Sequence, residues 1–253
     1  MEVQVLLAAL VGLAFGQLLD LAFARFYSDE PAFGPLYRCQ RCALKARRID
    51  FVPLAGYVSA LGRCPQCREA LPLRALLLPL GGGALFAASY LVFHELGPGL
   101  LGGLFATIFL TLTLTDLERR LLPNRIVYPS ILLAAALSWG WPDSSVADVL
   151  AGGGVAVAIA ALLLLVSLPF GRGAFGLGDV KMIVLIGFVT GLPSVLIGVF
   201  VGTIAGAVAA AILIITGLRS RRDYIPHGPF LALGAVIALF WGPQIWDWYL
   251  NAR

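Results

Sequence analysis

Charged residues are scarce in this sequence. Only 13% of its 253 residues are Asp, Glu, Lys or Arg, whereas 60% are hydrophobic. An average soluble domain has roughly 25% charged residues. The shortage excludes an ordinary soluble globular domain and indicates an integral membrane protein.

The hydrophobic segments also lack the alternation of polar and apolar residues that is typical of an outer-membrane β-barrel. Each segment is continuous, and a helix needs about 20 apolar residues to cross the hydrocarbon core. The sequence therefore predicts an all-α polytopic membrane protein with about eight transmembrane helices. We expect the helices at residues 3–24, 76–94, 97–115, 126–141, 147–169, 180–191, 194–217 and 228–249, with the sixth and seventh separated at Gly191-Leu192-Pro193.

Lys and Arg are absent from every second connecting segment. None lies in 94–97, 141–144 or 190–193, and all of them except the terminal Arg253 fall in or directly beside the other connections. Basic residues accumulate in cytoplasmic loops. We therefore predict that both termini lie outside and that the basic loops face the cytoplasm, where they meet anionic lipid headgroups. The net charge of +4 then requires no nucleic acid partner.

Cysteine is absent outside one predicted cytoplasmic loop, residues 25–75. There it forms two pairs, Cys39-Gln40-Arg41-Cys42 and Cys64-Pro65-Gln66-Cys67. Two such pairs at this separation are typical of a tetrahedral zinc site. Disulfides or unligated thiols are the alternative, but cytoplasmic thiols stay reduced. The sequence predicts a small zinc-ribbon-like loop with a structural zinc held by Cys39, Cys42, Cys64 and Cys67.

Two aspartates lie where predicted membrane helices meet basic loops. Asp116 follows the helix at 97–115, and Asp179 precedes the helix at 180–191. An ionisable residue at the edge of the hydrocarbon is a functional hypothesis by default. Both aspartates fall on the predicted cytoplasmic side, so the helix bundle can bring them together. Two close carboxyl groups share one proton, so that one acts on water as a base while the other donates to a scissile carbonyl. That is the chemistry of an aspartic protease.

Three further residues near Asp179 are predicted to support the substrate or the loop. Gly176 and Gly178 fit a backbone that bends sharply or admits a substrate strand closely. Lys181 could bias the charge of Asp179 or bind a substrate carbonyl, although a lysine snorkelling to the interface is the plainer interpretation. Histidine is also scarce: His94 and His227 are the only two, and we assign neither a catalytic role.

Other interpretations of the aspartates stay open at this stage. Asp116 could cap a helix end near the headgroups, and Asp179 could be the N-cap of its helix. An ion- or proton-coupled transporter also places carboxylates and broken helices in the membrane. A third interpretation is an inactive membrane anchor whose zinc loop serves as an assembly scaffold.

These features, in this order, resemble the bacterial type IV prepilin peptidases, which are membrane aspartic proteases with a Gly-x-Gly-Asp motif. The resemblance covers nearly the whole chain. Its motifs are the four-cysteine loop with Ile49 to Leu54 between the pairs, Asp116 followed by Leu121-Leu122-Pro123-Asn124, Gly176-Leu177-Gly178-Asp179-Val180-Lys181, and Pro226-His227 followed by Gly228-Pro229-Phe230-Leu231-Ala232.

The resemblance implies a peptidase of the bacterial inner membrane, working in type IV pilus assembly or type II secretion. It would remove the basic leader of prepilins or pseudopilins after a glycine on the cytoplasmic side, with Asp116 and Asp179 as catalytic residues. It could also methylate the new N-terminus with S-adenosylmethionine. The implied division is a first transmembrane helix at 1–24, a metal-binding loop at 25–75 and a transmembrane protease core at 76–253. The sequence names neither the substrate pilin nor an oligomeric state.

Two segments depart from the family pattern. Gln17-Leu18-Leu19-Asp20 stands where the family usually has Ser-Phe-Leu-Asn, and Pro79 stands where a glutamate usually ends the segment that begins at Arg74. Both departures lie in the half that the resemblance links to methylation. The resemblance therefore supports proteolysis more directly than methyl transfer.

Overall fold

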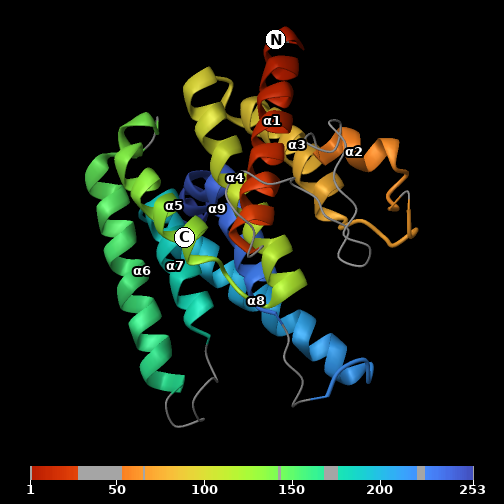
Figure 1. Cartoon of the computed structure of the whole chain (residues 1–253). Helices are drawn as coiled ribbons and strands as arrows, with labels where there is room; N and C mark the ends of the chain where they lie inside the picture. Colours follow the sequence, from red (N-terminus) through yellow and green to blue (C-terminus); the bar gives the residue numbers. More distant parts are fainter. Residues whose placement is uncertain are drawn as a thin grey trace. The chain divides into compact units, whose positions relative to one another are not determined.

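The computed structural model describes residues 2–27, 53–64, 66–141, 144–167, 176–220 and 226–252. Within these ranges the chain is helical apart from turns and an isolated β-bridge (Figure 1). This confirms the predicted all-α class for the described part of the chain. The helices are α1 (Glu2–Tyr27), α2 (Pro53–Ser59), α3 (Arg74–Phe93), α4 (Leu96–Arg119), α5 (Asn124–Ala136), the 3₁₀ helix η2 (Ser138–Gly140), α6 (Val146–Ser167), α7 (Leu177–Thr190), α8 (Ser194–Ile215) and α9 (Gly228–Asn251).

Six of these described helices are long and apolar enough to cross a membrane, namely α1, α3, α4, α6, α8 and α9. The protein is therefore a multi-pass membrane protein. Helices α5 and α7 match the other two predicted helices but have 13 and 14 residues. At about 1.5 Å per residue each is roughly 20 Å long, which is shorter than a hydrocarbon core of about 30 Å. The count of eight crossings stays a prediction.

Two boundaries test the predicted helices closely. Helix α7 ends at Thr190 and α8 begins at Ser194, so the predicted break between them is confirmed. Gly191 between them has a φ of 64°, which favours glycine. The predicted helix at 126–141 was too long, because α5 ends at Ala136. There the Ser138 hydroxyl donates a hydrogen bond of 2.8 Å to the Ala135 carbonyl, in place of a continuing α-helical turn.

The chain divides into two compact units, Met1–Thr107 and Ile108–Arg253. In the first unit α1 runs along α3. Glycines let the two backbones meet, since a Cβ on Gly82 would lie 2.5 Å from the Gly12 carbonyl oxygen. Ala8, Phe86 and Tyr90 form a buried cluster in this unit. The predicted division at residues 24 and 75 is a finer one and stays a prediction.

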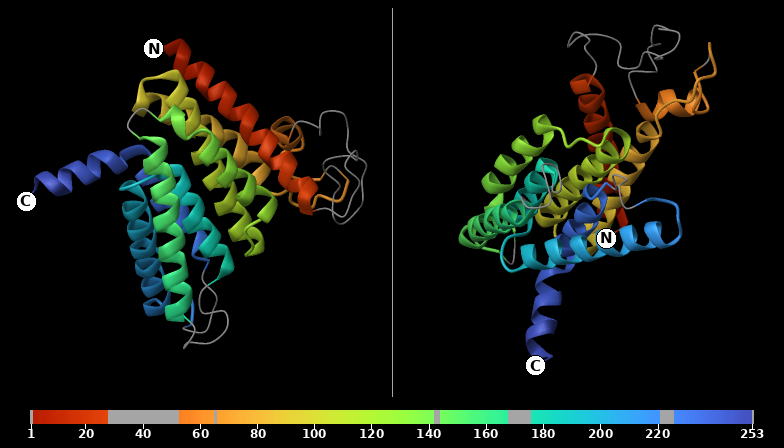
Figure 2. Two further views of the ribbon diagram at one scale, coloured as in Figure 1. Left: turned by 90° about the vertical axis from the view of Figure 1, so that its left-hand side faces the viewer. Right: turned by 90° about the horizontal axis from the view of Figure 1, so that it is seen from below.

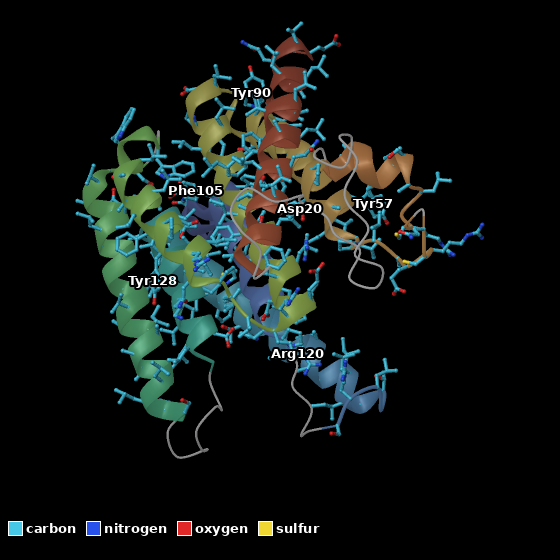
Figure 3. The ribbon with its side chains drawn as sticks, viewed as in Figure 1. Asp20, Tyr57, Tyr90, Phe105, Arg120 and Tyr128 are labelled. Atoms are coloured by element: carbon cyan, nitrogen blue, oxygen red, sulfur yellow. The ribbon has the colours of Figure 1, made fainter. Side chains whose placement is uncertain are left out.

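The first unit also contains a buried ion pair. Asp20 on α1, labelled in Figure 3, is fully buried, and the Nε atom of Arg74 donates to its Oδ1 at 3.0 Å. The guanidinium carbon of Arg74 lies 4.3 Å from the centre of the Phe23 ring. Arg74 is the first residue of α3, so this ion pair joins the end of α1 to the start of α3. The charge of Asp20 is thereby neutralised inside the fold.

In the second unit α7 is the central helix, because it packs against α5, α6, α8 and α9. Helices α6 and α7 meet through glycines: a Cβ on Gly187 would lie 2.5 Å from the Gly152 carbonyl oxygen. Helices α8 and α9 pack together in the same way, and Figure 2 shows the C-terminal end of α9 extending beyond α8. Most of the residues of α7 from Met182 to Thr190 are buried. The surrounding helices thus fix the helix that begins with Asp179.

Candidate active site

Asp116 lies near the C-terminal end of α4 and is only 4% exposed. The helix ends three residues later, where Arg120 adopts a φ of 55° and its N–H donates to the Asp116 carbonyl at 2.8 Å. The carboxyl group of Asp116 accepts a hydrogen bond from the Gly228 N–H. A Cβ on Gly228 would lie 2.6 Å from Oδ2 of Asp116, so no side chain fits there. The buried carboxyl group therefore faces the N-terminus of α9, whose dipole favours a negative charge.

His227 precedes this contact and completes the surroundings of Asp116. Its ring packs on α8, because a Cβ on Gly206 would lie 2.5 Å from the Nδ1 atom. Burial lowers the pKa of His227, and the nearby negative charge of Asp116 opposes that effect. Sequence reasoning gave His227 no role. The signal that could have found it was its place beside Gly228 in the fourth motif.

Asp179 lies in the first turn of α7 and is half-buried. Its own N–H donates to the Gly176 carbonyl at 3.0 Å, and its carboxyl group accepts a hydrogen bond from the Gly176 N–H. Gly176 is the N-cap residue, so Asp179 is the third helical residue and not the N-cap. This reciprocal pattern resembles a capping box. It holds the carboxyl group at the helix N-terminus.

The structure brings the two predicted aspartates together within the second unit. Asp179 lies close enough to Asp116 for their charges to interact. Two adjacent carboxylates repel each other, so such a pair favours a state with one shared proton. One carboxyl group is buried against α9, while the other is half-exposed at the start of α7. The arrangement provides an acid and a base at one place.

The two glycines before Asp179 lie in tight packing. A Cβ on Gly176 would lie 3.2 Å from Oδ2 of Asp179, and a Cβ on Gly178 would lie 3.3 Å from Cδ1 of Leu122. Neither glycine has a positive φ. A left-handed backbone therefore does not explain either glycine, and their predicted role in supporting the substrate or the loop stays a prediction. Close approach of neighbouring groups is the physical reason for glycine here.

Lys181, the third supporting residue, contacts α5. Its Nζ donates to Oδ1 of Asn124 at 2.7 Å and lies 5.7 Å from the centre of the Tyr128 ring. Figure 3 labels Tyr128 on α5. Sequence reasoning did not single out Asn124 as a site residue. The signal that could have found Asn124 was its place as the last residue of the Leu121-Leu122-Pro123-Asn124 motif.

Half of the predicted metal site belongs to the described residues, because Cys39 and Cys42 lie outside them. Cys64 is buried and Cys67 is half-buried. They occupy a tight turn in which Arg63 and Ala70 form an antiparallel bridge and the Arg68 N–H donates to the Cys64 carbonyl at 2.9 Å. Among the described residues no three His, Cys, Asp or Glu side chains gather as a metal site. The zinc site stays a prediction.

Comparison with known proteins decides the family. The profile of the type IV leader peptidase family matches residues 103–211, and that of the bacterial peptidase A24 N-terminal domain matches residues 10–93. A prepilin leader peptidase/N-methyltransferase of Aeromonas salmonicida is 30% identical over 84% of this chain and 74% of its own length. The chain belongs to the type IV leader peptidase family.

Other relatives of this leader peptidase family member cover nearly the whole chain. The Bacillus subtilis protein named prepilin leader peptidase/N-methyltransferase is 26% identical over 95% of both chains. The Stutzerimonas stutzeri protein of the same name is 26% identical over 98% of this chain and 94% of its own. No solved structure matches this chain. The predicted resemblance is confirmed, and nothing in these matches supports a transporter.

Proposed function

We propose that this protein is an intramembrane aspartic endopeptidase that removes the basic leader of type IV prepilins or pseudopilins after a glycine. The observation that supports this most strongly is the meeting of Asp116 and Asp179 in one unit. Both residues lie within the match to the type IV leader peptidase family. Relatives over most of the chain are named as prepilin leader peptidases.

The geometry suggests how hydrolysis proceeds. The ionised member of the pair takes a proton from water, whose oxygen attacks the scissile carbonyl carbon, while the protonated member donates to the carbonyl oxygen. The tetrahedral intermediate then collapses, the C–N bond breaks, and the proton taken from water passes to the leaving amine. The Gly228 and Gly176 N–H groups each hold one carboxyl group in place during these transfers.

We place this chemistry at the cytoplasmic face of the bacterial inner membrane. In this arrangement the six long helices cross the membrane, the shorter α5 and α7 enter it, and both termini lie outside. The basic segments after α1, α4, α6 and α8 face the cytoplasm. Asp116 then ends one crossing and Asp179 begins another at the same depth. The carboxyl pair therefore meets the substrate leader on the cytoplasmic side of the membrane.

Reconstituted cleavage tests the proposal. A prepilin is incubated with the wild type or with Asp179→Asn in liposomes, and the product mass is followed with and without S-adenosylmethionine. We expect the wild type to release the leader and Asp179→Asn to release none, because an amide cannot exchange the shared proton. Failure of the folded wild type to cleave several prepilins, or substantial cleavage by the variant, would contradict the aspartyl mechanism.

Methylation of the new N-terminus is a separate matter. The structure shows what the residues at the two positions that depart from the family pattern contact in the first unit. Asp20 is fully buried and already paired with Arg74, and the Cα of Pro79 would lie 2.9 Å from a Cβ on Gly16 of α1. We propose that the new N-terminus is also methylated with S-adenosylmethionine, as the names of the relatives suggest. A product mass raised by one methyl group would show that Pro79 is tolerated, and an unmethylated product would contradict the proposal.

We also propose that Cys39, Cys42, Cys64 and Cys67 hold a structural zinc ion. The turn at Cys64 and Cys67 fits this role, because it places two potential thiolate ligands on one short hairpin. Four thiolates leave no open coordination position, so the metal would order the loop and take no part in hydrolysis. Elemental analysis should find about one zinc per chain, and Cys64→Ser should lower that content. Metal-free protein with oxidised cysteines, prepared under reducing conditions, would favour disulfides.

A further inference from the structure

The two motifs that carry the aspartates touch each other through residues that are not aspartates. Helix α4 ends three residues after Asp116, and α5 begins at Asn124. The first turn of α5 is closed by hydrogen bonds from the Ile126 and Val127 N–H groups to the Pro123 carbonyl, at 2.9 and 3.0 Å. This turn therefore begins eight residues after Asp116 in the chain.

Lys181 reaches this turn from the helix that carries Asp179. Its ammonium donates to Oδ1 of Asn124 at 2.7 Å and lies over the ring of Tyr128 at 5.7 Å. Asn124 and Tyr128 are four residues apart on α5 and so share one face of that helix. The distance to the ring is within the range of a cation–π interaction. Lys181 thus joins the start of α7 to the start of α5.

A second contact lies on the other side of Asp179 in the sequence. Gly178 approaches Leu122 so closely that an added Cβ would lie 3.3 Å from its Cδ1. Gly178, one residue before Asp179, and Lys181, two residues after it, therefore both contact the segment that follows Asp116. Docking at two points fixes the first turn of α7 in both position and rotation, and with it the separation of the two carboxyl groups.

We propose that Lys181 and Asn124 are a positioning pair that sets the spacing of Asp116 and Asp179. Its kinetic consequence rests on the proposed peptidase function. Loss of the pair moves a carboxyl group relative to the scissile bond, which lowers kcat more than it raises KM. A lysine that bound the substrate carbonyl would behave differently, because its loss would raise KM and Asn124 would be dispensable.

A double-mutant cycle tests the pair. Lys181→Met keeps the apolar stem and removes the donor, and Asn124→Leu removes the acceptor. We expect each variant to lower kcat about five- to tenfold with KM little changed, and the double variant to be no slower than either single variant. Asn124→Asp should keep the wild-type kcat, because it restores an acceptor. Leu132→Met, which changes an exposed side chain further along α5, is the control and should cleave like the wild type.

Additive losses, or a normal kcat in Asn124→Leu with a raised KM in Lys181→Met, would overturn the proposal. A measurement that needs no substrate distinguishes failure of the positioning proposal from failure of the proposed peptidase function. Asp116→Cys and Asp179→Cys are combined, and oxidative cross-linking of the two positions is mapped by peptide mass spectrometry. Adding Lys181→Met should lower the cross-link yield several-fold even if the wild type cleaves no prepilin. An unchanged yield would show that the pair does not position the dyad.

Discussion

A buried carboxyl group has opposite electrostatic surroundings in the two units of this protein. In the first unit Asp20 is fully buried and is neutralised by the Arg74 guanidinium at 3.0 Å, which also stacks on Phe23. In the second unit Asp116 is 4% exposed, and the charge that acts on it is another carboxylate, Asp179, together with the His227 side chain. Similar burial therefore accompanies two different electrostatic environments.

This difference distinguishes an acidic residue that stabilises the fold from one that can take part in acid–base chemistry. A carboxylate with a close cation has its charge balanced and holds two helices together. A carboxylate beside a second carboxylate keeps a proton that can be exchanged, and the backbone N–H groups of Gly228 and Gly176 orient the pair without removing its reactivity. Burial alone does not distinguish the two cases. The sign of the charge next to the carboxyl group distinguishes them.

The largest expected effect comes from neutralising the acid of the second unit. Asp116→Asn should lower leader cleavage at least about a thousandfold, because general acid–base transfer through the pair is lost. Its thermal unfolding midpoint in detergent should stay the same or rise, since a buried carboxyl group near a like charge is removed. A large fall in that midpoint would show that Asp116 is structural, like Asp20.

The next effect concerns the acid of the first unit. Asp20→Asn should lower the free energy of unfolding by on the order of 3 kcal/mol, because the fully buried carboxylate that pairs with the partly buried Arg74 is lost. Cleavage per folded molecule should be retained. The double variant Asp20→Leu, Arg74→Met is the control and should recover most of the lost stability. Loss of cleavage in a fully folded Asp20→Asn protein would contradict the division of roles.

A smaller effect tests how the backbone orients the reactive acid. Gly228→Ala places a methyl group 2.6 Å from Oδ2 of Asp116, and should lower kcat about ten- to a hundredfold by displacing the carboxyl group. Gly154→Ala is a matched control, because a Cβ there would meet nothing within 4 Å. It should leave cleavage unchanged and stabilise α6 by about 0.5–1 kcal/mol. Equal activity in both variants would show that the Gly228 contact is unimportant.

Several features were predictable because they depend on composition and local order. The scarcity of charge identified a membrane protein, and the predicted apolar segments correspond in order to the six long helices and to the shorter α5 and α7. The place of each aspartate relative to a helix end was also predictable. The end of α5 was not, because apolar composition continues past Ala136 while the hydrogen bonding changes.

The sequence by itself determined the class of protein, the order of its helices and the two candidate aspartates, because each depends on residues that are close together along the chain. Only the tertiary structure decided that Gly228 holds Asp116, that Lys181 reaches Asn124, and that Asp20 is neutralised by Arg74. These contacts join residues far apart in the sequence. The physical reason is that helix packing within each unit sets which side chains meet, and no local pattern encodes those partners.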